Sequence, residues 1–297
     1  MTRLALIGDV HGAWDARDTA YFNGSDYDAV LFVGDLAPVA GGWDVAARIG
    51  ALRCPGLVIP GNHDGCTALQ LLAEMRQRPR AASRLSRGQE QRVAMIDEAL
   101  GPVVLGGYSL HEIAGLSIIA ARPHAMGGDR LYFAEYLRRR FDVGSMSQSA
   151  QKLCHLVDRA AEQVVFLAHN GPSGLGEAPD AIWGCDFDPS RGDFGDPDLR
   201  VAVDYAHATG REVRAVVAGH MHHRVPGGFR QWCRVENGTW HLNAARVPRI
   251  EVTGQGHRRY HLRLEIDDAA LRATEIWVGE DLRETLIPVQ APEQATS

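Results

Sequence analysis

The distribution of apolar residues along the chain predicts five short strands that are buried on both faces. Uninterrupted apolar runs of three to five residues occur at Leu4–Ile7, Ala29–Val33, Leu57–Ile59, Val164–Ala168 and Ala215–Ala218. A run of this length without polar alternation is typical of a strand that has other layers packed against both of its faces. The pattern therefore predicts a covered sheet.

Helix-compatible stretches separate these runs, at Trp43–Leu52, Thr67–Met75, Ser147–Glu162 and Pro197–Thr209. Alternating strands and helices indicate an α/β sheet with right-handed crossovers. The C-terminal third has short runs broken by turns, which predict antiparallel strands. These runs lie near Gln231–Val235, Thr239–Leu242, Ile250–Val252, Tyr260–Ile266 and Ala273–Val278. We therefore predict an α/β (α+β) fold, a four-layer sandwich of two mixed β-sheets flanked by helices.

No linker rich in Pro, Gly or Ser divides the chain. We predict a single domain over residues 1–287, followed by a polar, disordered tail at 288–297. Two segments, near 76–101 and 122–145, have the character of insertions and are rich in arginine. Either could form a lid over a phosphate site, or could consist of solvated helical faces and loops. Both interpretations stay open at this point.

Composition and charge narrow the class of protein. The 297-residue chain is 45% hydrophobic and 23% charged, as is ordinary for a globular protein. Its net charge of −6 argues against a nucleic-acid partner. The five cysteines are scattered without a CxxC pair, so we expect reduced thiols and a cytoplasmic location. No apolar run approaches the length of a membrane span, and we expect no membrane partner; the oligomeric state is open.

The candidate chemistry lies directly after the five predicted strands. Each strand is followed by residues of types that bind metals or phosphate: Asp9 and His11, Asp35, Asn62 and His63, His169, and His220 and His222. Open α/β sheets bind ligands at the edge formed by the carboxyl ends of their strands. We therefore expect these side chains to converge on one site.

The spacing and the residue types favour a pair of cations. Asp9 and His11 are two residues apart on an extended segment and so point to the same side, and His220 and His222 share that spacing. Carboxylate, amide and imidazole ligands without thiolate suit transition metals better than a structural zinc or a calcium ion. Seven of these residues, all except His63, are candidate ligands. That is too many for one cation but fits two cations that share a carboxylate. We predict two divalent transition-metal ions (Mn, Fe, Zn or Co).

The ordered blocks resemble those of the calcineurin-like metallophosphoesterase superfamily. They are Asp9-x-His11, Gly34-Asp35, Gly61-Asn62-His63-Asp64, His169 and Gly219-His220-x-His222, in the family's order. The resemblance implies that one metal is held by Asp9, His11, Asp35 and His222. It implies that the other is held by Asp35, Asn62, His169 and His220, with Asp35 bridging the two. It also implies that His63 contacts the phosphate and protonates the leaving group, and that two mixed sheets lie between helices.

Two departures from the family pattern bear on function. Many members have Gly-Asp-x-x-Asp, in which the second Asp orients the catalytic histidine. Here the run is Gly34-Asp35-Leu36-Ala37-Pro38, so that partner is missing. The chain also lacks the Asp-Arg-Gly and Gly-Asn-His-Glu motifs of the family's protein Ser/Thr phosphatases, which argues against a phosphoprotein substrate.

Residues outside the ordered blocks have weaker assignments. We expect Asp64 to brace its loop, and Asp196 either to orient a ligand histidine or to cap the following helix. The remaining histidines, such as His124, are expected to have structural or surface roles. Because arginine offers forked donors to phosphate, three arginines are candidates for substrate binding: Arg122, Arg130 and Arg191.

The sequence thus predicts a dinuclear-metal phosphoesterase that hydrolyses a phosphate mono- or diester of a small molecule or nucleotide. The attacking group would be a hydroxide bridging the two metals. Monoester and diester substrates are not distinguished by these residues. Two alternatives remain, a catalytically inactive scaffold with the same fold and a nuclease. The complete set of ligand positions argues against the first, and the acidic net charge argues against the second.

Overall fold

Two mixed β-sheets form the centre of the computed structural model, which describes residues 1–254, 256–267 and 270–288. In this part of the chain the larger sheet has eight strands, in the order β16-β15-β14-β1-β2-β3-β4, with β13 paired to β14. Strands β1 to β4 run parallel, and β1 is antiparallel to β14. The bounds are β1 (Thr2–Ile7), β2 (Ala29–Phe32), β3 (Gly56–Val58), β4 (Val104–Leu105), β13 (Ile250–Thr253), β14 (Gly256–Ile266), β15 (Leu271–Val278) and β16 (Glu284–Pro288).

The second sheet has six strands within the described ranges, in the order β11-β12-β8-β7-β6-β5. Its four central strands run parallel, and the edge strands β5 and β11 are antiparallel to their neighbours. The bounds are β5 (Ser109–Ile113), β6 (Leu116–Ala120), β7 (Gln163–Leu167), β8 (Glu212–Ala218), β11 (Cys233–Glu236) and β12 (Thr239–Asn243). A small separate pair consists of β9 (Arg224–Val225) and β10 (Gly228–Phe229).

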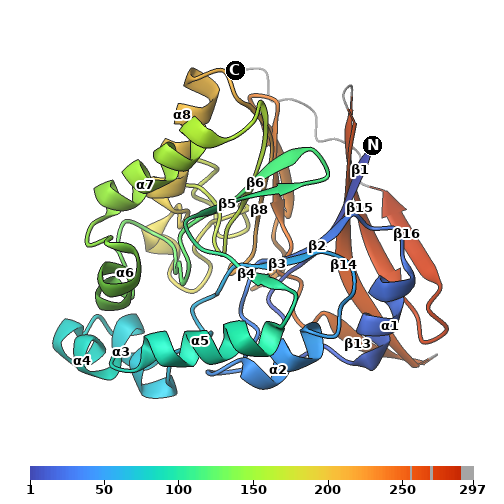
Figure 1. The fold of residues 1–297 in the computed structure, drawn as a ribbon, viewed down its shortest axis with the longest axis horizontal. Helices are drawn as coiled ribbons and strands as arrows, with labels where there is room; N and C mark the ends of the chain where they lie inside the picture. The colour runs from blue at the N-terminus through green and yellow to red at the C-terminus, as the bar shows by residue number, and fades with distance from the viewer. Residues whose placement is uncertain (255, 268–269, 289–297) are drawn as a thin grey trace.

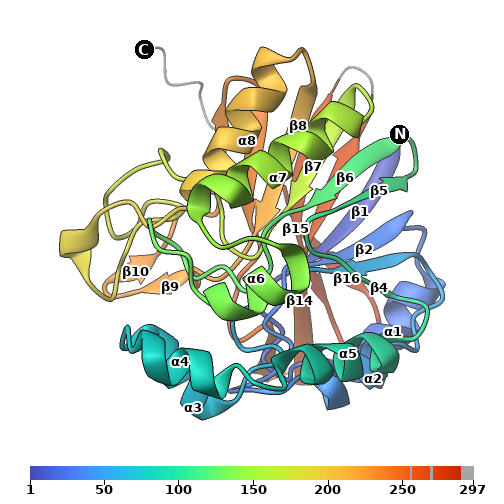
Figure 2. The same ribbon diagram turned by 60° about the vertical axis from the view of Figure 1, so that its left-hand side comes forward.

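Helices cover the outer faces of both sheets (Figures 1 and 2). On one side α7 and α8 lie next to each other, and on the other side lie α1, α2 and α5; α3, α4 and α6 gather at one end of the molecule. Their bounds are α1 (Ala16–Gly24), α2 (Trp43–Ile49), α3 (Ala68–Met75), α4 (Pro79–Leu85), α5 (Gln89–Leu100), α6 (Ala134–Phe141), α7 (Met146–Arg159) and α8 (Pro197–Ala208). The predicted four-layer sandwich is confirmed.

The apolar strands fill two cores at once. Leu4 and Leu6 of β1 are fully buried in the core between the sheets, whereas Ala5 and Ile7 are fully buried in the core beneath α1, α2 and α5. Successive side chains of a strand point to opposite faces, so a strand without polar alternation is needed where both faces are covered. The sequence-based interpretation of these runs is confirmed.

The predicted direction of one C-terminal strand was wrong. We expected antiparallel strands after residue 231, but β12 pairs with β8 in parallel, with Trp240 opposite Ala215. The β11–β12 hairpin reverses the chain once more before it meets β8, and the sequence pattern does not report that reversal. The β5–β6 hairpin was also missed, because Ser117, itself buried, interrupts the apolar run of β6.

The two predicted insertions are partly helical. Residues 76–101 include α4 and α5, and residues 122–145 contain a loop followed by α6. A lid role for either segment stays a prediction. Pro288 ends β16, and the rest of the predicted tail, 289–297, lies outside the described residues. No helix in the described ranges has the length and apolar character needed to cross a membrane.

A buried histidine makes the stability of the fold dependent on pH. His241 in β12 is 1% exposed, and burial, together with the positive charges of Arg200 and Arg234, lowers its pKa to about 3. The unfolded chain binds a proton near pH 6.5 while the folded protein does not, so stability falls as the pH decreases below that value. We expect this residue to cost on the order of 1–2 kcal/mol of unfolding free energy between pH 6.5 and 5.

Thermal unfolding measured across this pH range tests the expectation. The variant His241→Leu should lose part of the acid destabilisation, whereas His155→Leu, at an exposed position of α7, should keep it. An identical pH dependence in His241→Leu and the unaltered protein would contradict the assignment.

Candidate metal centre

The seven predicted ligands come together where strands of both sheets end. Asp9 and His11 follow β1, and the others follow β2, β3, β7 and β8 in chain order. Among the described residues, three groups of side chains place their ligand atoms within 4.8 Å of one another. These groups are Asp9, His11 and His222; His11, Asp35 and His63; and Asp35, His169 and His220. Six predicted ligands therefore belong to the groups, and the seventh, Asn62, contacts His169.

The first group has nitrogen and oxygen atoms that face one another. Nε2 of His222 lies 3.1 Å from Oδ2 of Asp9 and 3.2 Å from Nε2 of His11. Nδ1 of His11 lies 3.2 Å from the carbonyl oxygen of Ala37, and it is therefore the ring nitrogen that donates a proton. The lone pair of a neutral His11 is then on Nε2, turned toward the other members of the group. A cation among these atoms could be bound by the carboxylate of Asp9 and by the lone pairs of His11 and His222.

The group of Asp35, His169 and His220 repeats this arrangement. Nδ1 of His169 donates to the carbonyl oxygen of Val33 at 2.6 Å, so the ring is fixed by the backbone of the β2 loop. Its Nε2 lies 2.9 Å from Oδ1 of Asn62 and 3.5 Å from Oδ1 of Asp35. Burial and the charge of His169 lower the pKa of the neighbouring His220 to about 3, which keeps His220 neutral and able to bind a metal. The donor set fits a divalent transition metal.

Asp35 lies between His11 of the first group and His169 of the last. Its Oδ2 is 3.8 Å from Nε2 of His11, and its Oδ1 is 3.5 Å from Nε2 of His169. Burial alone would raise the pKa of Asp35, but the charges of His169 and His63 outweigh burial and lower it, so the group is a carboxylate. A carboxylate in this position could contact a cation in either group.

The backbone at the site adopts an unusual conformation. His11, Asp35 and His220 have φ angles of 43°, 49° and 63°, in the left-handed region that residues other than glycine rarely enter. The N–H of His11 donates to the carbonyl oxygen of Asp35 at 2.7 Å, which ties the first two loops together. Such strain costs about 1–3 kcal/mol per residue and gathers at functional sites. The surrounding fold therefore holds the predicted ligands in place against a local cost.

The absence of a side chain at Gly219 leaves room for the carboxylate of Asp9. A Cβ atom at position 219 would lie 2.4 Å from Oδ1 of Asp9, which also accepts a hydrogen bond from the N–H of His220 at 3.1 Å. We expect Gly219→Ala to displace this carboxylate and to weaken metal binding about tenfold or more, as measured by titration with Mn²⁺. Gly24→Ala is a matched control, because a Cβ there meets nothing within 4 Å. Equal metal affinity of the two variants would contradict the role of Gly219.

His63 stands at the edge of the site without a partner for one ring nitrogen. Its Nε2 lies 3.9 Å from Oδ2 of Asp35, and its buried Nδ1 has no hydrogen-bond partner among the described residues. This agrees with the absence of the second Asp from the Gly34-Asp35 block. Burial lowers the pKa of His63, and the charge of Asp35 opposes that effect.

Asp64 joins two of the loops, as predicted. Its Oδ1 accepts hydrogen bonds from the N–H groups of Leu36 at 2.8 Å and Ala37 at 3.2 Å, and its Oδ2 accepts one from Gly61 at 2.8 Å. Burial and the nearby charge of Asp35 raise the pKa of Asp64 to about 7. Asp64 therefore braces the loops that carry Asp35 and His63.

The structure corrects one of the predicted substrate arginines. Arg122 is buried, and its guanidinium donates to Asp198 at 2.8 Å and to Asp196 at 2.7 Å. Its guanidinium forms ion pairs with two carboxylates inside the protein and is not available to bind a substrate phosphate. Arg130 is half-buried beside the ring of Tyr132, and Arg191 is exposed over the ring of Phe194. These two arginines stay candidates.

Asp196 has neither of the roles that we expected. It precedes α8 at the N-cap position, but its side chain forms no capping hydrogen bond. The carboxylate binds Arg122 instead, and burial raises its pKa to about 7. Its backbone N–H donates to the carbonyl oxygen of Gly171 at 2.7 Å, two residues beyond His169. The ion pair therefore supports the loop that carries His169.

Three further residues support the site: His124 has the structural role that was expected, whereas Arg230 and Asn243 were not assigned from the sequence. His124 is fully buried, and its Nδ1 contacts the carbonyl oxygen of Gly61 at 2.8 Å. Arg230 donates to the carbonyl oxygen of His222 at 3.1 Å. Nδ2 of Asn243 donates to the carbonyl oxygen of Met221 at 2.7 Å. The only sequence signal was for Asn243, a polar residue directly after an apolar strand, like the predicted ligands.

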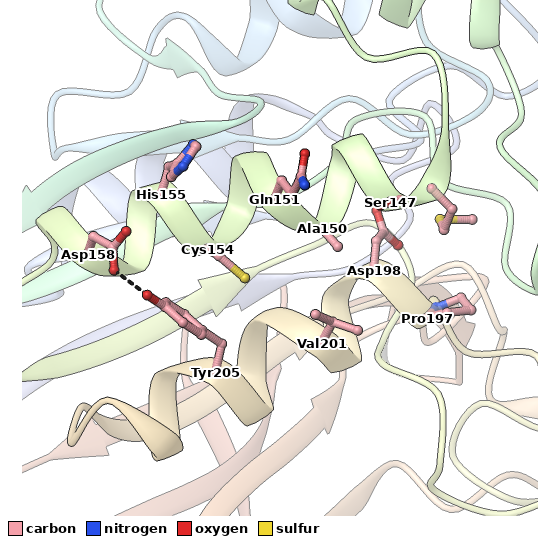
Figure 3. A pocket seen from close by; sticks show the side chains of 11 residues that line it. Ser147, Ala150, Gln151, Cys154, His155, Asp158, Pro197, Asp198, Val201 and Tyr205 are labelled. Carbon is pink, nitrogen blue, oxygen red and sulfur yellow. Dashed lines mark hydrogen bonds between the residues drawn. The ribbon is translucent and has the colours of Figure 1, made fainter.

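A pocket of about 630 Å³ lies between α7 and α8 (Figure 3). Cys154, Val201 and Tyr205 line it, and the hydroxyl of Tyr205 donates to Asp158 at 2.7 Å. None of the predicted ligands lines this pocket. It is a feature of the helical layer and is separate from the candidate metal centre.

A search of curated proteins found no match. Among solved structures, wild-type Vps29 complexed with Zn from Entamoeba histolytica has a TM-score of 0.40 at 13% identity, over 97% of this chain and 98% of that one. A predicted phosphoesterase from Streptococcus pneumoniae has a TM-score of 0.31 at 14% identity, over 97% and 98% of the two chains.

A third similar structure is the sulfate thiohydrolase SoxB from Thermus thermophilus, in complex with glycerol. Its TM-score is 0.38 at 15% identity, over 82% of this chain and 38% of SoxB. TM-scores this low carry no argument about activity. The sequence profile of the calcineurin-like phosphoesterase family matches residues 2–224, which include every predicted ligand and most of the chain. The chain therefore belongs to the calcineurin-like phosphoesterase family.

Proposed function

We propose that this protein hydrolyses a phosphate mono- or diester of a small molecule or nucleotide with the aid of two divalent transition-metal ions. The observation that carries the proposal is the pair of facing donor groups on either side of Asp35. In each group, a histidine has its Nδ1 directed at a backbone carbonyl, so that its Nε2 lone pair points at the other donors. Two such groups sharing one carboxylate match the requirements of a dinuclear centre.

The residues divide into two sets of ligands. One metal would be held by Asp9, His11 and His222, and the other by Asn62, His169 and His220, with Asp35 available to both. When bound, two such cations supply Lewis-acid polarisation of phosphoryl oxygens and activation of a water molecule. Mn, Fe, Zn and Co all suit these ligands.

The charge balance of the site favours an anionic substrate. Asp9 and Asp35 are both ionised, because burial, which alone would raise their pKa values, is outweighed by nearby histidines that lower them. These two carboxylates offset only half of the charge of two divalent cations. The remaining positive charge, about two units, would attract a phosphate ester to an otherwise acidic protein.

His63 would act on the substrate itself. Its Nε2 lies 3.9 Å from Oδ2 of Asp35, beside the proposed dinuclear centre, and the ring is partly exposed. From this position a protonated His63 could donate to a phosphoryl oxygen or to the departing ester oxygen. Arg130 and Arg191 are further candidates for contacts to the phosphate.

Hydrolysis assays with purified protein test the proposal. The protein is freed of metal, loaded with Mn²⁺, and incubated with p-nitrophenyl phosphate and with bis-p-nitrophenyl phosphate. We expect turnover of at least one ester that depends on added metal, together with two bound metals per chain by elemental analysis. Two bound metals without turnover of either ester would favour the inactive scaffold, and fewer than two would contradict the proposed centre.

A further inference from the structure

The outward face of α3 is entirely apolar. Leu69, Leu72 and Met75 are 66%, 42% and 60% exposed, and they follow the three-residue spacing of one helical face. The opposite face is already used, because Leu71 and Ala73 are buried against the protein. A helix on the surface of a monomeric protein ordinarily presents charged or polar residues to water. The apolar outer face of α3 therefore indicates an interaction site.

Five arginines follow this face within twelve residues. They are Arg76, Arg78, Arg80, Arg84 and Arg87. All five are exposed, and none of them forms an ion pair with any residue that the structure describes. The only acidic residue between positions 68 and 88 is Glu74, which is buried. In a chain of net charge −6, this segment is a local concentration of positive charge. Its partner should therefore be anionic.

The position of the two helices leaves them accessible. In both views α3 and α4 lie at the periphery of the molecule, away from the two sheets (Figures 1 and 2). The helices pack against each other, so the apolar face and the arginines belong to one helical hairpin. We call residues 68–88 the α3–α4 hairpin.

The chemistry of the hairpin distinguishes between possible anionic partners. Single-stranded nucleic acids are bound by aromatic side chains that stack on bases, and there is no aromatic residue between positions 65 and 100. A symmetric contact between two copies of the hairpin would offer these arginines no exposed carboxylate, because Glu74, the one acidic residue of 68–88, is buried. Exposed aliphatic side chains and five exposed arginines on one hairpin instead suit the boundary between the headgroups and acyl chains of a bilayer that contains acidic lipids.

We propose that the α3–α4 hairpin docks on the surface of membranes that contain anionic lipids. Leu69, Leu72 and Met75 enter the headgroup boundary, and the arginines contact lipid phosphates. A surface contact of this kind needs no membrane-spanning helix, so it is compatible with the absence of such a helix from the described residues. The proposal departs from the sequence-based expectation that the protein has no membrane partner.

Docking would hold at the bilayer a segment that continues from one loop of the candidate metal centre. Thr67 caps α3 and is only four residues beyond His63, so the hairpin continues directly from one of the loops of the site. The docking does not depend on hydrolysis, and it can be measured on protein that has no activity.

Sedimentation of the full chain with vesicles tests the inference. We expect the protein to pellet with vesicles of phosphatidylcholine mixed with phosphatidylserine, but not with vesicles of phosphatidylcholine alone. Binding should weaken as salt is added, because the arginines act through screened charge. Equal binding to the two kinds of vesicle, or binding to neither, would overturn the inference.

Matched variants locate the contact on the hairpin. The double variants Leu69→Ser with Leu72→Ser, and Arg80→Gln with Arg84→Gln, should each weaken binding at least tenfold. Val201→Ser and Arg53→Gln alter exposed residues elsewhere and should leave binding unchanged. Circular dichroism confirms that each variant is folded. Unchanged vesicle binding by both double variants would overturn the inference. So would a second result, in which the protein does not bind vesicles but forms a dimer or a complex with single-stranded DNA, and the leucine double variant loses that dimer or complex.

Discussion

Asp35→Asn should release both metals and lower phosphoester hydrolysis by about 10³-fold or more. Asp35 is the carboxylate that lies between the two groups, 3.8 Å from Nε2 of His11 and 3.5 Å from Nε2 of His169. Asparagine keeps the size of the side chain but removes the charge that two neighbouring cations would share. It also keeps an oxygen that can accept the N–H of His63, which donates to Asp35 at 3.0 Å. The loss should therefore reflect metal binding and not a collapse of the loop.

Elemental analysis and metal-dependent hydrolysis are measured on the same preparations. Asp44→Asn is the matched control, because Asp44 is exposed on α2 and belongs to none of the three groups. The control should retain two metals per chain and its full rate. If Asp35→Asn also retained two metals and a rate close to that of the control, the shared-carboxylate arrangement would be wrong.

The convergence of the site could be predicted because it follows from the topology of parallel strands. Each apolar run ends in a loop at the same edge of its sheet, so the residue directly after the run is placed without knowledge of distant contacts. Asp9, Asp35 and His169 illustrate this rule, since each lies within three residues of the end of its strand. The burial of alternate β1 side chains in the two cores could also be predicted from the apolar run alone.

What could not be predicted depends on contacts between residues far apart in the chain. Arg122 was expected to bind substrate, but it pairs with Asp196 and Asp198, more than seventy positions away. An arginine in a loop has the same local sequence signal whether its partner is a phosphate or a buried carboxylate. The direction of β12 relative to β8 likewise could not be predicted from the local sequence, because it depends on how the intervening hairpin turns the chain.

His63→Ala should retain both metals and lower turnover by about 10²–10³-fold for an ester with a poor leaving group, such as phenyl phosphate. His63 is adjacent to Asp35 and within reach of His11, but the two proposed ligand sets are complete without it, so its loss should spare metal binding. The loss should be much smaller for 2,4-dinitrophenyl phosphate, because its leaving group departs without a proton. His155→Ala, at an exposed position of α7, is the control and should not alter either rate.

The comparison of the two esters separates two roles of His63. A loss confined to the poor leaving group supports proton donation, whereas an equal loss for both esters supports a contact to the phosphate alone. The second result would fit the unpartnered Nδ1 of His63, because nothing among the described residues fixes the ring in the way that the missing second Asp does in many relatives. Full activity toward both esters would refute any role of His63 in catalysis.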